Sequence, residues 1–393
     1  MSSNEIRRQD WTPKTSEPIF EVYDRLRSEC PVAHSDDYGG FWMLTRYADV
    51  SKAARDWKTF SSAAGSPFIE LPDFRAIPLN FDPPEHGRVR GILNRYVKPD
   101  RIAAMQPQLQ RFVTEHVDEL LDDGRGDAYV LASTLPQRAL ALLLNMPDDT
   151  YLLFMAKLHQ IHEAAVANDV ERANALMRNL WTDEVVELVE ARRAQPLDPD
   201  TDLMSGVLAA EIDGEPIPPE VCVAIGIQLM SAGGDTTTSA ISNSLWFLAR
   251  DRELQDRLRK DPALVPAAVE EFLRLRPPLH HLARTATTDT QVGGCPIAAN
   301  SRVSLNYAAA NRDPNAFPQP DVIDIDRSPN RHLTFGFGPH LCLGAPLARL
   351  ELHLVLTQLL ARTSGFELDG DAVEQPKNSL GSGFSSLPLR FTF

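Results

Sequence analysis

The feature that most constrains the fold of this chain is a long segment without proline between Pro219 and Pro262. Pro218 and Pro219 open the segment, and proline is favoured at the first position of a helix. The sequence therefore predicts one helix of about 30 residues over Glu220–Arg250, roughly 45 Å long at 1.5 Å per residue. Such a helix would cross the whole molecule.

Apolar residues at i, i+3 and i+4 spacing predict further helices on both sides of this segment, and short β-like pieces lie between them. No repeat or low-complexity linker divides the chain, so we predict one domain over residues 1–393, mainly α with small β-sheets (α+β). The predicted helices are Pro18–Glu29, Ala48–Asp56, Pro107–Leu121, Leu131–Leu144, Thr150–Ala167, Val170–Ala194, Glu253–Lys260, Ala263–Arg274 and Ala345–Arg362, and the predicted strands are Phe41–Thr45, Leu282–Thr287, Gln291–Val292 and Val303–Tyr307.

The charge balance excludes several kinds of partner. The 393 residues include 54 acidic and 39 basic ones, for a formal charge of -15, which disfavours a surface for nucleic acid or for an anionic membrane. No segment approaches the ~18 apolar residues of a membrane span, and residues 1–20 contain no apolar run. We therefore expect a cytoplasmic protein without nucleic-acid or membrane partners, and a loosely ordered segment over residues 1–17.

One of the four cysteines lies in an unusual setting. Cys342 is in the glycine-rich window Phe335–Gly344, directly before the helix predicted over Ala345–Arg362. The free N–H groups and the positive end of a helix dipole stabilise a thiolate and lower its pKa, which favours a nucleophile or a metal ligand. The alternative is an ordinary buried cysteine beside a glycine-rich turn.

A second window lies in the middle of the long helix, at Ala232-Gly-Gly-Asp-Thr-Thr237. Gly233 and Gly234 each cost ~1 kcal/mol in a helix interior, and the Thr236 hydroxyl can bond back to a carbonyl. We therefore expect a local widening or kink that makes room for a small ligand. The alternative is close helix packing at the glycines with a solvated Asp235.

Two charged pairs are weaker signals. Glu271 and Arg274 are spaced i, i+3 and can pair, as many solvated helix surfaces do. His86 and Arg90 are spaced i, i+4, so they share a helical face that suits a pair of carboxylates. The alternative for this second pair is a capped helix start with solvated charges.

Together these windows resemble the cytochrome P450 family of haem-thiolate monooxygenases, soluble bacterial type. Phe335–Gly344 matches the family pattern FGxGxHxCxG in full, Ala232–Thr237 matches the oxygen-activation motif, and the resemblance extends from about Pro18 to the end of the chain. It implies the cytochrome P450 fold, haem b with Cys342 as the axial ligand of the iron, and dioxygen as co-substrate. Thr236 would hydrogen bond around the bound dioxygen, and Asp235 would deliver protons.

The resemblance also implies roles for three groups of residues. Arg327, in the stretch before the cysteine, would join Glu271 and Arg274 in a buried structural cluster. Phe68, Ile69 and Phe74, together with residues from later segments, would form an apolar substrate pocket. The implied haem contacts are His86, Arg90, Arg284, Phe335, Gly336, His340 and Gly344, and the remaining implied pocket residues are Leu229, Ala232, Leu279, His280 and Phe384.

No nicotinamide or flavin motif is present in the sequence, so electrons are expected to come from NAD(P)H through a separate ferredoxin and reductase. Arg88, Arg95 and Arg349 are candidates for docking such an acidic carrier. The implied reaction is hydroxylation or oxidative O-demethylation of a small to medium apolar molecule. Two alternatives stay open: a peroxide-driven peroxygenase, against which Asp235 and Thr236 argue, and a non-enzymatic haem- or ligand-binding protein.

Overall fold

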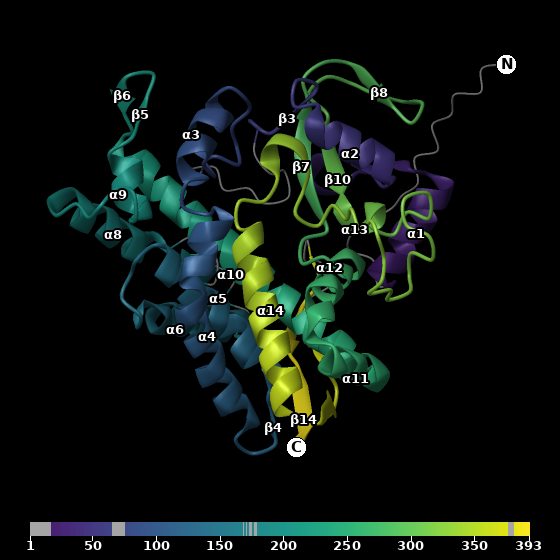
Figure 1. Ribbon diagram of the computed structural model, residues 1–393. Coiled ribbons are helices and arrows are strands. Elements are labelled where there is room, and N and C mark those ends of the chain that lie inside the picture. The colour runs from purple at the N-terminus through teal and green to yellow at the C-terminus, as the bar shows by residue number, and fades with distance from the viewer. Residues whose placement is uncertain are drawn as a thin grey trace.

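The computed structural model describes residues 17–64, 75–167, 169, 171–172, 175–176, 179–375 and 381–393. Helices make up most of it, with small sheets at two sides (Figure 1). The helices are α1 (Ile19–Glu29), α2 (Tyr47–Arg55), α3 (Glu85–Leu93), α4 (Pro99–Leu121), α5 (Ala128–Leu143), α6 (Thr150–Val166), α8 (Thr182–Ala194), α9 (Leu203–Leu208), α10 (Pro219–Ala249), α11 (Arg252–Lys260), α12 (Val265–Leu275), α13 (Tyr307–Ala310) and α14 (Ala345–Arg362), with 3-10 turns η1 (Asp37–Gly39), η2 (Pro262–Leu264) and η3 (Gly338–His340).

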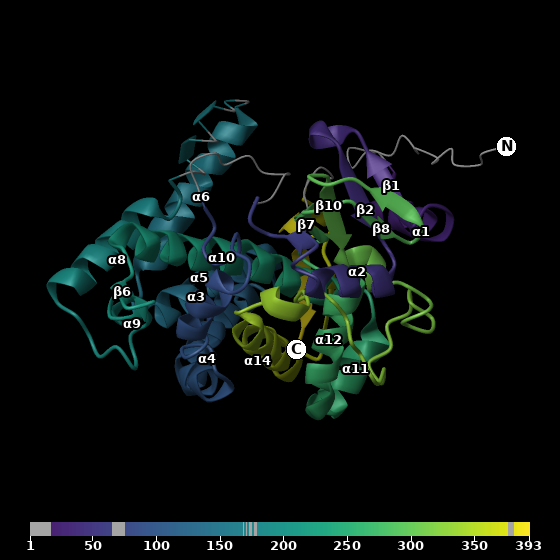
Figure 2. The same cartoon turned by 90° about the horizontal axis from the view of Figure 1, so that it is seen from above.

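The long helix is present as predicted. α10 begins at Pro219, one residue from the predicted start, and ends at Ala249. It crosses the middle of the molecule, with α3, α4, α5, α8 and α9 around its first half (Figure 2). Most of its second half is buried, from Thr237 to Leu245, and this part forms the centre of the protein. The helix therefore connects the helical side of the fold to the side that carries the sheet.

The main sheet lies beside α1 and α2 and has the strand order β1-β2-β10-β7-β3. β2 and β10 pair in parallel, with Ser304 opposite Met43, while the other neighbours in this sheet are antiparallel. A second sheet has the order β11-β14-β4, and three two-stranded ribbons complete the strands. The strands are β1 (Val32–Ser35), β2 (Phe41–Leu44), β3 (Phe60–Ser61), β4 (Arg125–Asp127), β5 (Glu211–Ile212), β6 (Glu215–Pro216), β7 (His281–Ala286), β8 (Thr290–Val292), β9 (Cys295–Ile297), β10 (Arg302–Asn306), β11 (Gly365–Leu368), β12 (Val373–Glu374), β13 (Phe384–Ser386) and β14 (Pro388–Thr392).

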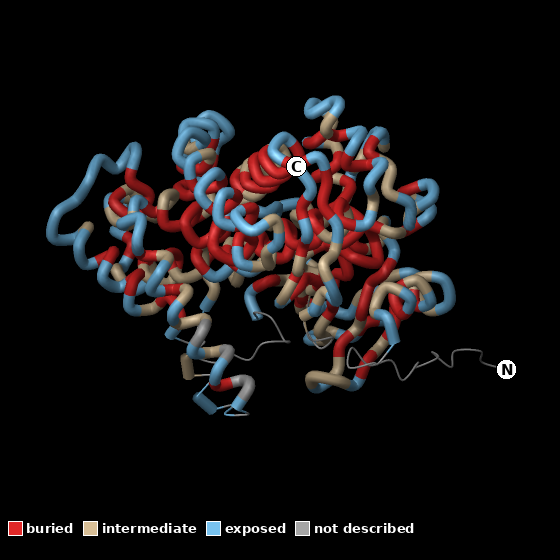
Figure 3. The backbone as a smooth tube through the Cα atoms, turned by 90° about the horizontal axis from the view of Figure 1, so that it is seen from below, coloured by how far each residue is buried: buried red, intermediate tan, exposed pale blue. Residues whose placement is uncertain are grey.

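The largest core cluster lies where α14 packs against α4 and where α5 packs against α10. Leu109 of α4, Leu135 of α5 and Val355 of α14 are completely buried there. The buried backbone is continuous across this region, and exposed residues gather on the outer helices and loops (Figure 3). This core holds α10 and α14 in place on two sides of the cavity described below.

Two predicted helices differ from the structure. α4 begins at Pro99 rather than at Pro107, which lies inside the helix. An internal proline removes one helical hydrogen bond, but Pro107 is exposed and the buried face of α4 continues past it. The helix predicted over Val170–Ala194 is interrupted by a turn at residues 179–181, where Trp181 stacks on Phe154 and α8 begins.

The sequence analysis also missed the sheet of β4, β11 and β14, whose strands have only three to five residues. In the described part of the chain, no helix is long and apolar enough to cross a membrane.

Candidate active site

A cavity of about 430 Å³ lies in the centre of the molecule. α10 forms one of its walls, and the loop of Cys342 with the first turns of α14 forms another. Cys342 lines it, as do Phe335, Gly336 and Gly344 from the same window. The fold therefore brings together the two most unusual windows of the sequence, although they are about 100 residues apart.

The cysteine loop is held tightly by its own backbone. The Cys342 N–H donates to the Phe335 carbonyl at 2.7 Å, and the Gly336 N–H donates to the Leu333 carbonyl at 2.8 Å. Gly338 adopts a φ of 74°, and a Cβ atom there would lie 2.9 Å from the Ala54 carbonyl oxygen of α2. Only glycine fits this position without strain, so the close approach of α2 shapes the loop.

The surroundings of Cys342 push its pKa in two directions. N–H groups of Gly344 and Ala345, at the start of α14, and the charges of Arg90 and Arg349 favour the thiolate, as the sequence predicted. Burial acts in the opposite direction and is the largest effect, so the pKa of this thiol is raised rather than lowered. The expectation of a lowered pKa is therefore wrong for the protein alone. A metal cation at the sulfur would add the missing stabilisation of the thiolate.

Four cationic or potentially cationic side chains gather near the cysteine. The rings of His86, on α3, and His340 lie 4.2 Å apart between centroids. Arg90 donates to the Leu341 carbonyl, and Arg284, on β7, is buried close enough for its charge to act on both histidines. Burial, with help from the two arginines, lowers the pKa of His86 to about 4 and that of His340 to about 3. Both histidines are therefore neutral unless anions approach them.

A buried ion cluster supports the segment that leads into the cysteine loop. Arg274 donates to both carboxylate oxygens of Glu271, at 2.8 and 2.7 Å, and both residues are completely buried. Arg327 donates to the same two oxygens at 3.2 Å, and the Asp324 N–H and the Asn330 amide each donate to one of them. Arg274 also donates to the carbonyls of Asn311 and Pro320. The solvated surface pair considered for Glu271 and Arg274 is therefore wrong.

The two glycines of the window in α10 pack against α5, and one of them also lines the cavity. A Cβ atom on Gly234 would lie 2.6 Å from the Gln137 amide nitrogen, and one on Gly233 would lie 2.8 Å from a methyl group of Leu140. Both neighbours belong to α5, so close packing between α5 and α10 requires the glycines. Gly233 also lines the cavity. Of the expected widening or kink, the widening is not seen, because α10 is α-helical throughout, and the kink stays a prediction. The Thr236 hydroxyl donates to the Ala232 carbonyl at 2.7 Å, as expected.

Asp235 and Thr236 differ in their surroundings. Thr236 lines the cavity. The Asp235 side chain is exposed, yet protein surrounds its carboxyl closely enough to raise its pKa, and its charge acts on Tyr129 of α5. Asp235 is therefore a carboxyl whose proton affinity is higher than usual, next to a threonine that lines the cavity.

The structure separates the predicted pocket residues into three groups. Leu229, Ala232 and Leu279 line the cavity. His280 does not: it is buried against α1, where its Nδ1 lies 3.2 Å from the Tyr23 hydroxyl. Phe384 packs in the core against Trp246. Phe68, Ile69 and Phe74 lie outside the described residues.

The sequence analysis missed several polar side chains that line the cavity, among them Gln228, Ser231 and Glu351. Gln228 and Ser231 precede Ala232 by four residues and one residue on α10. Gln228, Ala232 and Thr236 form an i, i+4 series, so extending the helical spacing backwards from Thr236 would have found Gln228. Glu351 follows Gly344 by seven residues, and the same spacing on α14 would have indicated it.

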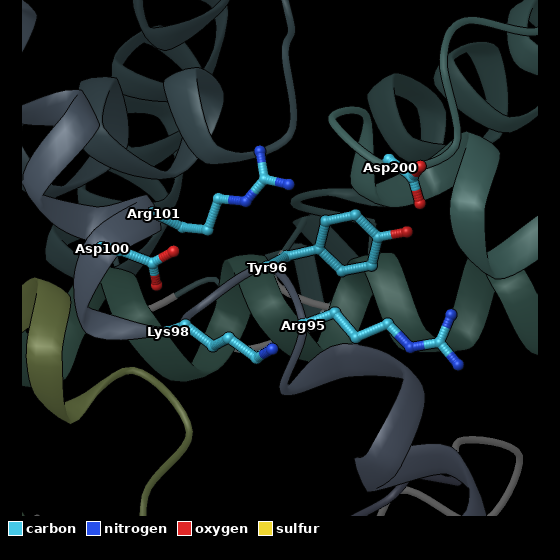
Figure 4. A pocket seen from close by; sticks show the side chains of 6 residues that line it. All are labelled: Arg95, Tyr96, Lys98, Asp100, Arg101 and Asp200. Carbon is cyan, nitrogen blue, oxygen red and sulfur yellow. The ribbon is translucent and has the colours of Figure 1, made fainter.

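A smaller pocket of about 220 Å³ lies on the other side of the segment that joins α3 to α4 (Figure 4). Arg95, Lys98 and Arg101 line it, with Tyr96 between them and two carboxylates, Asp100 and Asp200, at its edges. Val97 of the same segment lines the large cavity instead. This pocket is therefore a cationic outer face of the cavity wall.

The fold is mainly helical, and Cys342 lines its central cavity. Cationic side chains lie at the edge of this cavity, and the crossing helix carries an acid and a threonine beside it. These features together are those of haem-thiolate enzymes. The family model described as Cytochrome P450 matches residues 141–393. The chain belongs to the cytochrome P450 family. It is a cytochrome P450 monooxygenase, with a haem cofactor and oxygen-dependent chemistry.

Relatives cover nearly the whole chain. Cytochrome P450 109 of Bacillus spizizenii is 33% identical, over 95% of this chain and 92% of the relative. Cytochrome P450-terp of a Pseudomonas species is 32% identical, over 96% and 94%. The solved structure of cytochrome P450 CYP109Q5 from Chondromyces apiculatus superposes with a TM-score of 0.83 at 31% identity, over 95% of each chain. The predicted family and fold class are thus confirmed.

The residues present fit a haem. The Nε2 atom of His86 is buried with no hydrogen-bond partner among the described residues, next to the cationic group at one end of the cavity. Two carboxylates of a haem edge would satisfy this nitrogen and reverse the electrostatic effect that keeps His86 and His340 neutral.

Proposed function

We propose that this chain inserts one oxygen atom of dioxygen into a small to medium apolar molecule, with electrons from NAD(P)H supplied by a separate ferredoxin and reductase. The observation that carries the proposal is the arrangement of the cavity, with Cys342 on one wall and Thr236 on α10. A haem held by a thiolate supplies the oxidising chemistry, because the thiolate donates electron density that favours O–O cleavage.

The residues of this chain would then act as follows. His86, Arg90, Arg284 and His340 would bind the haem carboxylates, and Phe335, Gly336 and Gly344 would contact its faces. The Thr236 hydroxyl would hold a proton at the oxygen-binding site, and the Asp235 carboxyl would supply it. The raised pKa of Asp235 supports this role, because an efficient proton donor has a pKa closer to the working pH.

The cavity wall supports an apolar substrate. Leucines dominate it, and Gln228 and Ser231 on α10 are polar groups able to orient one functional group of a ligand. A screen by spin-state shift identifies a ligand, and turnover of that ligand under isotopically labelled dioxygen tests the proposal. With NAD(P)H, ferredoxin and reductase present, we expect one labelled oxygen atom in a hydroxylated product. In a demethylation, the labelled atom is expected in the hydroxymethyl intermediate that releases formaldehyde. Turnover with hydrogen peroxide alone would favour the peroxygenase alternative.

Replacing Asp235 by asparagine is expected to slow product formation by about 10²-fold, because the amide supplies no proton. Thr236→Val is expected to divert reducing equivalents to hydrogen peroxide, since the site loses the hydroxyl that holds the proton. The measurement is the ratio of product to NAD(P)H consumed, with the solvent isotope effect. Thr238→Val is the matched control, since the Thr238 hydroxyl makes the same kind of bond, to the Gly234 carbonyl, but does not line the cavity. A wild-type rate of product formation in Asp235→Asn, or coupling in Thr236→Val equal to that of Thr238→Val, would contradict these roles.

The docking surface for the electron carrier also needs revision. Arg88 is paired with Asp213, and Arg349 makes two hydrogen bonds to Glu270, so both charges are already compensated. We propose instead that the cationic pocket of Arg95, Lys98 and Arg101 docks an acidic carrier.

Reversing both Arg95 and Arg101 to glutamate is expected to slow reduction by the ferredoxin about tenfold or more at low salt, through weaker electrostatic steering. Stopped-flow reduction at several ionic strengths measures the effect, which should shrink as salt is added. Lys260→Glu, a charge reversal at the exposed last residue of α11, is the control. Unchanged rates in the double variant would rule out this docking surface.

A further inference from the structure

Glu351 is a buried acid that none of the roles described above uses. It lies on α14, is 2% exposed, and lines the cavity together with Gly344, Leu347 and Ala348. The spacing of these four residues places them on one face of the helix. Because α14 follows Cys342 directly, this face bounds the cavity on the side of the cysteine.

The carboxyl of Glu351 has no compensating charge nearby. Its Oε2 atom is buried without a hydrogen-bond partner among the described residues. The charged groups of α14 bind other residues, Arg349 to Glu270 and Arg362 to Asp118. The titratable His353 is two residues from Glu351 and so lies on the opposite side of the helix.

The ion pairs on the helices packed against α14 are formed between other residues and do not include Glu351. On α12, Glu271 is bound by Arg274 and Arg327, and Glu270 is bound by Arg349 and His332. The pKa of Glu351 is shifted by burial alone, so the charge of Asp235 on α10 does not contribute to this shift. On α4 and α11, Arg111 pairs with Glu115, His116 with Glu119, Arg257 with Asp326, and Arg259 with Asp256 and the carbonyls of Leu360 and Thr363. Asp100 and Arg101 line the outer pocket, and Glu253 and Lys260 are exposed at the surface.

An isolated carboxylate in such surroundings is far less favourable than a neutral carboxylic acid. The acid form has one O–H donor, and a buried donor needs an acceptor. Burial raises the pKa of Glu351 to about 8, in agreement with the neutral form at pH 7.

We propose that Glu351 is a positioning residue that remains a neutral carboxylic acid and donates a hydrogen bond to a buried water on the cysteine side of the haem. Buried waters commonly satisfy polar groups that no side chain reaches. The inference rests on the proposed haem occupancy of the cavity. Its consequence is electrostatic: an ionised Glu351 would add an uncompensated negative charge on the side of the thiolate and make the iron harder to reduce.

The infrared spectrum of the holoprotein tests the protonation state directly. At pH 7 the wild type is expected to show a protonated-carboxyl band that is missing from Glu351→Gln, at a frequency typical of a hydrogen-bonded acid. The band should disappear as the pH is raised through about 8. If this band is absent at pH 7, Glu351 is not a neutral acid and the proposal is wrong. If the band is present at a frequency typical of a free acid, Glu351 does not donate a hydrogen bond to a buried water.

The haem potential, measured by spectroelectrochemistry between pH 7 and pH 9, tests the consequence. The wild-type potential is expected to shift to more negative values with rising pH by a larger amount than that of Glu351→Gln, which stays neutral. Thr357→Val, which removes another buried polar atom of α14 outside the cavity, should behave like the wild type. Identical pH profiles for the wild type and Glu351→Gln would overturn the electrostatic role.

The spectrum of the reduced protein with carbon monoxide separates the two possible failures. If it lacks the band of a thiolate-bound haem, the proposed function itself fails. If that band is present but the carboxyl band is missing, only the inference about Glu351 fails.

Discussion

Replacing Cys342 by serine is expected to remove the long-wavelength Soret band of the reduced, carbon monoxide-bound protein and to reduce monooxygenase activity below detection. A serine hydroxyl is a poor donor of electron density to haem iron compared with a thiolate, so the effect that favours O–O cleavage is lost. The fold should survive, because the Cys342 N–H bond to Phe335 belongs to the backbone and is unchanged.

Absorbance spectra of the purified variants measure this effect. Cys342→His provides a second arm, since an imidazole ligand would give a histidine-type band in place of the thiolate band. Cys295→Ser is the matched control, because this half-buried cysteine lies on β9, away from the cavity. A thiolate-type band that persists in Cys342→Ser would refute the assignment of the axial ligand.

Replacing Glu271 by glutamine is expected to lower the free energy of unfolding by about 3–5 kcal/mol, the usual result of removing one partner from a buried ion pair. The amide would leave Arg274 and Arg327 without a counter-charge in the interior, and the segment before the cysteine would lose its anchor. Because domains are typically stable by only about 5–15 kcal/mol, haem incorporation should fall as well.

Urea unfolding together with haem content measures this effect. Asp326→Asn is the control, because Asp326 lies on the same segment as Arg327 and forms an ion pair with Arg257. Both side chains of this pair are exposed, and exposed pairs contribute about 1 kcal/mol or less. Burial by itself would raise the pKa of Glu271, but its hydrogen bonds and the two arginines together outweigh burial and lower it. Its stabilisation is therefore complete above its ordinary pKa and is lost as the pH falls through the folded-state value. Equal stabilities of the two variants at pH 7 would show that the Glu271 cluster does not hold the loop.

Much of the site was predictable because its residues lie in short local patterns. The ten-residue window around Cys342 and the six-residue window around Asp235 each place several groups by backbone spacing alone, and the long proline-free segment predicts α10 to within a residue at either end. The short strands β4, β11 and β14 were not predictable, since three to five residues carry too little alternation to be distinguished from loops.

By itself, the sequence determined the family, the crossing helix and the cysteine that faces its cavity, because these depend on local spacing. Only the tertiary structure decided which charges are compensated and which side chains reach the cavity. It turned His280 toward Tyr23, paired Arg349 with Glu270, and buried Glu351 without a partner. The physical reason is that burial and charge pairing depend on elements far apart in the sequence, and no local pattern records which of them meet.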